Sequence, residues 1–261
     1  MLTPRTVPLR PGLDLALREA GHGRPVLVLH GGPGPAGIVP LISHLATDHA
    51  VLAPTHPGWE DTMRPDDLDS VPALAAAYLD LLRHLALHDV TVIGTSFGGW
   101  AATQAALDDH EDRISQLILI DAIGPVIPGQ QISMPSGPPP APAPRASTEP
   151  GPSPAPRRGP SLASQAALRA YAGPSMADPG LLPRLAHVTC PVLVIWGQDD
   201  TVVSPDYGRA YATAFPQARF ELIPGAGHQP LREKPDAVLA ALDRFLAPQN
   251  GTATTTSSET S

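Results

Sequence analysis

Residues 94–98 read Gly-Thr-Ser-Phe-Gly, and no other stretch of this chain is as well suited to chemistry. The pattern G-x-S-x-G is typical of a serine at a sharp turn from a strand into a helix, where its hydroxyl is exposed for nucleophilic attack. Such a turn strains the backbone at its apex, and glycines two positions before and after relieve the crowding. The flanking sequence fits, because residues 89–93 are a β-branched run and residues 100–107 favour a helix. Ser96 is therefore a candidate nucleophile.

Three further segments place chemical groups after apolar runs that we expect to be strands. Residues 30–34, His-Gly-Gly-Pro-Gly, form a glycine-rich bend that leaves backbone N–H groups free to point at a developing oxyanion. Residues 197–200, Gly-Gln-Asp-Asp, supply an acid, and residues 225–228, Gly-Ala-Gly-His, supply an imidazole. Functional groups gather outside the C-terminal ends of the strands in an open parallel sheet. We therefore expect these groups and Ser96 to meet at one edge of the sheet.

The elements that would position these groups repeat one theme, in which short apolar runs alternate with helical stretches. Continuous apolarity indicates strands covered on both faces, so we predict an α/β fold with a mainly parallel twisted sheet and helices on both faces. The expected central strands are residues 26–29, 50–54, 90–93, 117–120, 192–196 and 220–223. Residues 71–87 and 235–246 carry apolar residues at helical spacing. Residues 13–19 alternate apolar and polar, which predicts an antiparallel edge strand that turns back into residues 25–29.

One segment departs from this alternation of apolar runs and helical stretches. In residues 134–160, 11 of 27 positions are proline, and such a composition buries too little apolar surface to offset its ordering entropy, so we expect disorder. We divide the chain into an α/β core at residues 1–124 and 185–249 and an insertion at residues 125–184. Residues 250–261 are polar and are predicted to be a disordered tail.

The composition argues against several classes of function. A formal charge of −8 without a Lys/Arg cluster argues against nucleic acid or an anionic membrane as a partner and favours a small-molecule substrate. Cys190 is the only cysteine, so neither an intrachain disulfide nor a cysteine-based metal site can form. The first ten residues lack an apolar signal region, and no run approaches the roughly 18 apolar residues of a membrane helix. We expect a cytoplasmic protein, and the sequence carries no signal for its oligomeric state.

Taken jointly, the four segments resemble the signature segments of the α/β-hydrolase superfamily. They stand in the chain order Ser, Asp, His that this superfamily uses. The resemblance covers about residues 10–124 and 185–247, and the insertion between them occupies the usual cap position of the superfamily.

The resemblance implies a role for each matched residue. Ser96 would be the nucleophile, His228 the general base and then acid, and Asp200 the group that orients His228. The oxyanion hole would consist of the backbone N–H groups of Gly32 and Phe97. No metal and no cofactor are implied.

Some neighbouring residues have competing interpretations. Asp199 is an alternative acid that we interpret as a turn residue, and Asp121 is a more distant alternative because some members carry the acid after the preceding strand. His30 is interpreted as a support for the oxyanion loop, His56 as a structural or solvated loop histidine, and Trp59 as a packing residue.

The function that the resemblance implies is a serine hydrolase, esterase-like, that cleaves a small-molecule ester or related carbonyl substrate through an acyl-enzyme. One alternative is a proline iminopeptidase, because residues 30–34 resemble the corresponding segment of those enzymes. Their nucleophile turn, however, reads Gly-Gly-Ser-Trp-Gly, and their cap is larger and more acidic. A carbon–carbon bond hydrolase is another alternative. From a different class comes a non-catalytic ligand-binding protein of the same fold.

Overall fold

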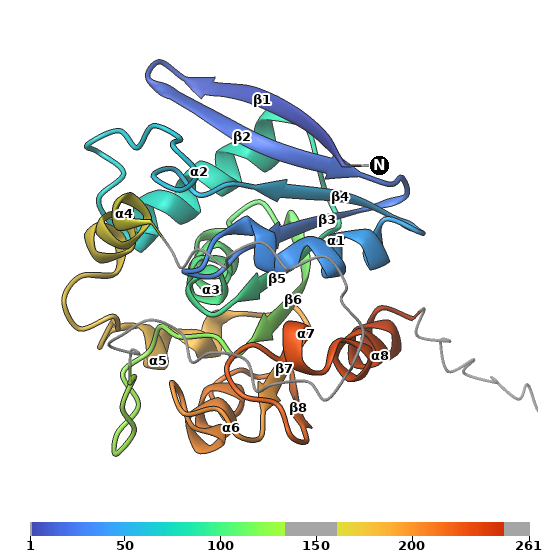
Figure 1. The fold of residues 1–261 in the computed structure, drawn as a ribbon, viewed down its shortest axis with the longest axis vertical. Coiled ribbons are helices and arrows are strands. Elements are labelled where there is room, and N and C mark those ends of the chain that lie inside the picture. The colour runs from blue at the N-terminus through green and yellow to red at the C-terminus, as the bar shows by residue number, and fades with distance from the viewer. Residues whose placement is uncertain (1, 134–160, 248–261) are drawn as a thin grey trace, which may run out of the picture.

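The computed structural model describes residues 2–133 and 161–247, which form an eight-stranded sheet covered by helices (Figure 1). The strands are β1 (Thr3–Arg10), β2 (Leu13–Ala20), β3 (Arg24–Leu29), β4 (His49–Pro54), β5 (Val90–Thr95), β6 (Ile114–Ile120), β7 (Val192–Gly197) and β8 (Ala218–Ile223). Their order in the sheet is β1-β2-β4-β3-β5-β6-β7-β8. The pairs β1–β2 and β2–β4 are antiparallel, and every other pair is parallel. The predicted mainly parallel sheet is confirmed.

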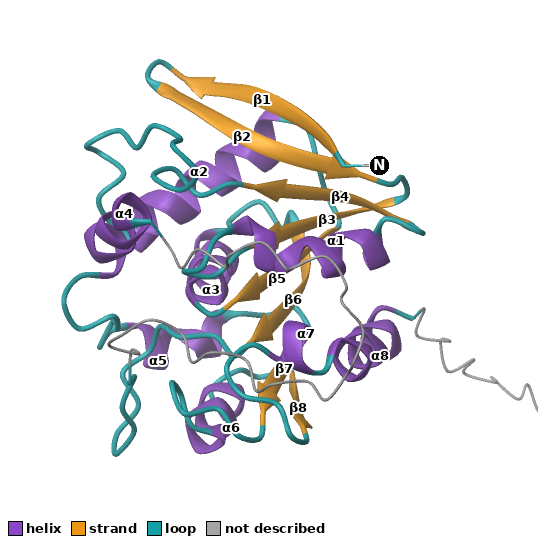
Figure 2. Cartoon of the chain, viewed as in Figure 1, coloured by secondary structure: helices purple, strands orange, loops and turns teal. Residues whose placement is uncertain are grey.

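Helices cover both faces of the sheet (Figure 2). They are α1 (Val39–Leu45), α2 (Val71–His84), α3 (Phe97–Asp108), α4 (Leu162–Ala172), α5 (Leu181–Arg184), α6 (Pro205–Thr213), α7 (Pro230–Glu233) and α8 (Pro235–Leu246), with 3-10 turns at Pro35–Ile38 and Leu185–His187. Consecutive strand residues point to opposite faces, so Val92 packs in one core cluster with α2, α3 and α6, whereas Ile93 packs in the other with α1 and α8. Among the described helices, none combines the length and apolarity needed to cross a membrane.

The antiparallel edge differs from the sequence-based prediction. β2 pairs with β4 and not with β3, the strand that follows it. The crossover from β3 through α1 lays β4 parallel beside β3, so only the outer edge of β4 is open to β2. Strand β1 was not predicted. It contains prolines at positions 4 and 8, which an edge strand tolerates.

The described part of the predicted insertion packs against the core. Tyr171 of helix α4 contacts the core in two ways. Its hydroxyl donates to the carbonyl oxygen of Pro57 at 3.1 Å, and its ring stacks on Trp59 with 6.1 Å between the ring centroids. The predictions of disorder for residues 134–160 and 250–261 fall outside the described residues, and the division into core and insertion stays a prediction.

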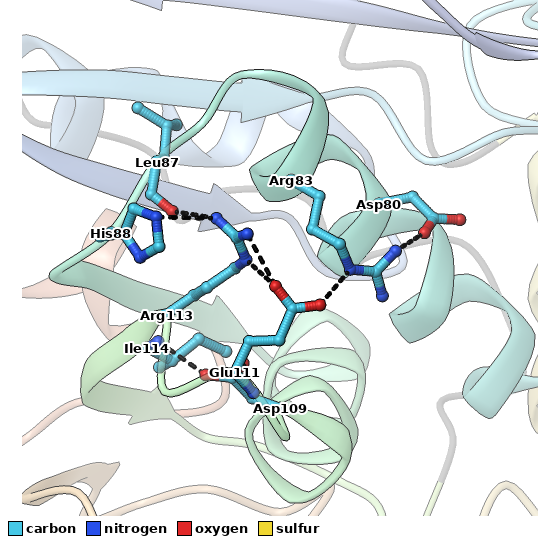
Figure 3. A network of polar contacts seen from close by, with 8 residues as sticks. All are labelled: Asp80, Arg83, Leu87, His88, Asp109, Glu111, Arg113 and Ile114. Carbon is cyan, nitrogen blue, oxygen red and sulfur yellow. Dashed lines mark hydrogen bonds and ion pairs between the residues drawn. The ribbon is translucent and has the colours of Figure 1, made fainter.

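A polar network fixes the loops at the N-terminal edge of the sheet, where β5 and β6 begin (Figure 3). Glu111 accepts from Arg83 at 2.9 Å and from Arg113 at 2.7 Å, and these interactions, led by the hydrogen bond from Arg113, lower the pKa of Glu111. Arg113 also donates to the carbonyl oxygen of Leu87 at 2.9 Å. Exposed ion pairs of this kind stabilise a fold only slightly. The network lies at the opposite edge from the predicted catalytic groups, which follow the C-terminal ends of the strands.

Candidate active site

Ser96 lies at the turn between β5 and α3, in a conformation that few non-glycine residues adopt. Its φ is 49° and its ψ is −116°. A Cβ atom on Gly94 would lie 2.3 Å from the carbonyl oxygen of Gly98, and one on Gly98 would lie 2.4 Å from that of Leu29. The two flanking glycines are therefore required by close backbone approach, as the sequence pattern predicts.

Ser96, His228 and Asp200 form a continuous line of hydrogen bonds. Ser96 Oγ lies 3.0 Å from His228 Nε2, and His228 Nδ1 lies 2.8 Å from Asp200 Oδ2. Because a carboxylate only accepts, Nδ1 carries the proton of a neutral His228 and Nε2 is free to accept from the serine hydroxyl. Both ring nitrogens of His228 are thereby engaged in hydrogen bonds, one to Ser96 and one to Asp200.

The acid is held rigidly at the end of β7. Asp200 Oδ1 accepts from the backbone N–H groups of Val202 at 2.7 Å and Val203 at 3.1 Å, and the Asp200 side chain is fully buried. His228, in the loop after β8, keeps 20% of its side chain exposed. The imidazole is thus oriented from the protein interior and can still be approached from outside.

The two alternative acids lie in different surroundings. Asp199 is exposed, and its backbone N–H donates to the carbonyl oxygen of Ala226 at 2.8 Å. Asp121, after β6, is buried next to Asp200, and its Oδ1 accepts from the backbone N–H of Gly197 at 2.8 Å. Of the three aspartates, Asp200 is the one hydrogen bonded to His228 in the described structure.

The glycine-rich loop after β3 lies directly against Ser96. A Cβ atom on Gly31 would lie 3.2 Å from Ser96 Cβ. The backbone N–H groups of Gly32 and Phe97, the predicted oxyanion donors, have no acceptor among the residues the structure describes. The assignment of these two amides as oxyanion donors stays a prediction.

Three ring nitrogens hold three successive carbonyl oxygens of this loop. His56 Nε2 lies 2.7 Å from the oxygen of His30, His30 Nδ1 lies 2.8 Å from that of Gly31, and Trp59 Nε1 donates to that of Gly32 at 2.9 Å. In a trans peptide the C=O and the following N–H point in opposite directions. The bond to the Gly31 oxygen therefore turns the Gly32 N–H the other way.

The hydrogen bonds also fix the tautomers of both histidines. The backbone N–H of His56 donates to His30 Nε2 at 3.0 Å, so the proton of His30 is on Nδ1. The carbonyl oxygen of His30 can only accept from His56 Nε2, so the proton of His56 is on Nε2 and the Tyr78 hydroxyl donates to Nδ1. Burial, followed by the nearby His56, lowers the pKa of His30, and burial lowers the pKa of His56 to about 4. Both rings are neutral donors at neutral pH.

The sequence pointed to only part of this loop support. His30 was expected to support the loop, whereas His56 and Trp59 were interpreted without a link to it and Tyr78 was missed. One sequence signal could have linked His56 and Trp59 to this loop. They come just after β4, which lies beside β3 in the sheet, so they follow the strand next to the one that the loop follows.

Apolar and aromatic side chains border the loop and Ser96. Leu168 of α4 comes within 3.3 Å of where a Cβ on Gly32 would be. Trp59 stacks on Phe97 at 5.8 Å, and Tyr171 lies 6.0 Å from Phe97. A substrate group beside the Gly32 amide would therefore meet an apolar surface.

Comparison with known proteins shows the family of the chain. A family profile described as "Alpha/beta hydrolase family" matches residues 26–241. Over 264 residues the chain is 28% identical to the 2-hydroxy-6-oxononadienedioate/2-hydroxy-6-oxononatrienedioate hydrolase 1 of Dechloromonas aromatica, covering 87% of this chain and 89% of the relative. A shorter match of 66 residues to the protein BpoC of Mycobacterium tuberculosis is 44% identical and spans 25% of each chain.

The fold is also found among solved structures. The crystal structure of E-2-(acetamidomethylene)succinate hydrolase superposes with a TM-score of 0.73 at 21% identity, covering 94% of this chain and 99% of that one. At this identity the likeness shows the fold alone. The region matched by the family profile contains Ser96, Asp200 and His228.

Proposed function

Since the chain belongs to the alpha/beta hydrolase family, we propose that it is a serine hydrolase that cleaves a small-molecule ester through an acyl-enzyme. The observation that carries the proposal is the hydrogen-bonded line from Ser96 through His228 to the buried Asp200. It joins a nucleophile, a base and an orienting carboxylate from three separate strand ends.

In this mechanism Ser96 Oγ attacks the substrate carbonyl while His228 Nε2 takes the hydroxyl proton. Asp200 holds the ring in the tautomer that makes this transfer possible and stabilises the imidazolium that results. His228 then donates the proton to the leaving alcohol, which departs and leaves Ser96 acylated. A water molecule, deprotonated by His228, cleaves the acyl-enzyme and restores the serine.

The negative oxygen of each tetrahedral intermediate would be stabilised by the N–H groups of Gly32 and Phe97. Removal of one such donor costs about 10²- to 10³-fold in rate in enzymes of this type. Two ring nitrogens support this role: His30 Nδ1 at the Gly31 carbonyl and Trp59 Nε1 at the Gly32 carbonyl hold the peptide groups on both sides of Gly32 before substrate arrives.

Hydrolysis of a carbon–carbon bond is a second candidate, favoured by the relative from Dechloromonas aromatica, which is named as a hydrolase of 2-hydroxy-6-oxo compounds. The two candidates differ in the leaving group that His228 must protonate, a carbon in one case and an oxygen in the other. A panel of short and long acyl esters, aminoacyl amides and a 2-hydroxy-6-oxodienoate would separate them and would also test the iminopeptidase alternative.

The basic test is turnover of p-nitrophenyl acetate by the wild type and by Ser96→Ala. We expect the substitution to lower kcat by about 10³-fold or more, since the nucleophile is lost. Ser115→Ala is a matched control, because Ser115 lies near the start of β6, at the opposite edge of the sheet. Equal turnover by Ser96→Ala and the wild type would refute the nucleophile assignment, and a wild type that turns over no member of the panel would favour a ligand-binding protein.

A further inference from the structure

Asp121 is a buried titratable group beside the proposed catalytic residues that the mechanism above does not use. It follows β6, which lies between β5 and β7, so its carboxyl group reaches the same edge of the sheet as Ser96 and Asp200. One oxygen of Asp121, one of Asp200 and one ring nitrogen of His228 all lie within 4.8 Å of one another. Asp121 is only 1% exposed.

Of the two carboxyl oxygens of Asp121, only one accepts a hydrogen bond from the described residues. Oδ1 accepts from the Gly197 N–H at 2.8 Å, whereas the buried Oδ2 has no partner among the described residues. An ionised oxygen buried without a donor is costly, and a second carboxylate nearby adds repulsion. Burial, Asp200 and Glu233 of α7 all raise the pKa of Asp121, against the single opposing effect of the Gly197 N–H.

We propose that Asp121 is a reserve carboxyl group for His228: it keeps its proton while Asp200 is ionised, and it ionises and stabilises protonated His228 when the charge of Asp200 is removed. The proposal rests on the proposed serine-hydrolase function. Asp121 is in this sense a positioning residue, since it acts on the substrate only through His228.

The charge balance follows from the geometry. With both carboxyl groups in place, Asp121 and Asp200 together carry one negative charge and one proton, and Asp200 carries the charge because two backbone N–H groups and His228 donate to it. When Asp200 becomes alanine, the repulsion disappears and a space opens between Asp121 and His228. Asp121 then releases its proton to solvent, and the negative charge lies within reach of the imidazole.

A double-mutant cycle on p-nitrophenyl acetate turnover tests this proposal, with Asp121→Asn, Asp200→Ala and the double variant. In Asp121→Asn the side-chain amide oxygen can still accept from the Gly197 N–H, so the structural bond of Oδ1 is preserved. We expect Asp121→Asn to lower kcat at least about tenfold more when residue 200 is alanine than when it is aspartate. In Asp200→Ala, kcat/KM should rise with pH as Asp121 ionises, and this rise should be absent from the double variant.

Asp199→Asn is the matched control, because it removes an exposed carboxylate one residue away. It should lower kcat by the same factor in both backgrounds. An Asp121→Asn effect of equal size in both backgrounds, or a pH profile of Asp200→Ala identical to that of the double variant, would overturn the proposal.

A second measurement covers the case in which Asp200→Ala fails to fold. The infrared spectrum of the wild type at pH 7 should show a protonated-carboxyl band that Asp121→Asn lacks, and absence of this band from the wild type would overturn the proposal. The band does not depend on turnover. If Ser96→Ala retained activity, the proposed function would be refuted. The infrared spectrum would still show whether Asp121 is protonated.

Discussion

Two buried tryptophans, Trp59 and Trp100, allow a matched test of how the oxyanion loop is held. Trp59 and Trp100 are 1% and 4% exposed, and both lose the same atoms on substitution by phenylalanine. Trp59 Nε1 donates to the Gly32 carbonyl oxygen at 2.9 Å, whereas Trp100 Nε1 has no acceptor among the described residues. The difference between Trp59→Phe and Trp100→Phe therefore isolates one hydrogen bond.

The size of the effect follows from burial. Trp59→Phe leaves the Gly32 carbonyl without this donor, which costs about 1–3 kcal/mol of folding free energy, while Trp100→Phe removes an unpaired polar group and should cost less. A chain of this size shifts its Tm by about 2–4 °C per kcal/mol. A loosened Gly32 peptide should also lower kcat for an ester by about tenfold, a fraction of the 10²- to 10³-fold lost with a whole oxyanion donor.

The assay combines urea unfolding of both variants with kcat and KM for p-nitrophenyl acetate. We expect lower stability and lower kcat in Trp59→Phe than in Trp100→Phe, with similar KM. If the two variants lose equal stability and equal kcat, the ring nitrogen of Trp59 does not position the loop.

Three further outcomes are expected. Burial lowers the pKa of His56 from 6.5 to about 4. The neutral ring therefore contributes fully to folding stability above pH 6.5, and this contribution is lost as the pH falls towards 4. Between pH 7 and pH 4.5, urea unfolding should show a smaller loss of folding free energy in His56→Gln than in the wild type. A Cβ on Gly98 would lie 2.4 Å from backbone oxygens, so Gly98→Ala should yield little folded protein, whereas Gly37→Ala, where a Cβ meets nothing within 4 Å, should unfold at nearly the wild-type temperature. Leu168→Ala removes a side chain beside Gly32 and should raise kcat/KM for longer acyl esters relative to acetate; an unchanged ratio would show that Leu168 does not limit acyl size.

Local sequence was sufficient for the nucleophile turn and the parallel strands. The turn at Ser96 depends on glycines whose positions are dictated by backbone contacts within a few residues or with the neighbouring strand. The parallel strands are buried on both faces, so their apolar runs are visible without any knowledge of partners.

The resemblance indicated Asp200 rather than Asp199, but the contacts that favour Asp200 are not encoded in local sequence. The two residues are consecutive in a turn, and either could face the histidine. The backbone N–H of Asp199 is hydrogen bonded to Ala226 in the loop that carries His228, and the carboxyl group of Asp200 is hydrogen bonded to His228 itself. Such a contact joins two loops that follow neighbouring strands and are far apart in the chain.

The support of the oxyanion loop was hidden for a similar reason. His56 follows β4 and contacts His30 because β4 pairs with β3, and Tyr78 of α2 contacts His56 in turn. Local sequence does not show which strands are neighbours in the sheet. For this reason residues 13–19 were expected to turn back into β3, whereas β4 lies between β2 and β3.

The central claim is that Ser96 is a nucleophile activated by His228. The most direct measurement is covalent labelling with a fluorophosphonate, followed by mass spectrometry of the labelled peptide, in the wild type, His228→Ala and the control His187→Ala. We expect the label on Ser96 in the wild type and in His187→Ala, and labelling slowed by about 10³-fold in His228→Ala. A label on another residue, or equal labelling rates in the wild type and His228→Ala, would contradict the account.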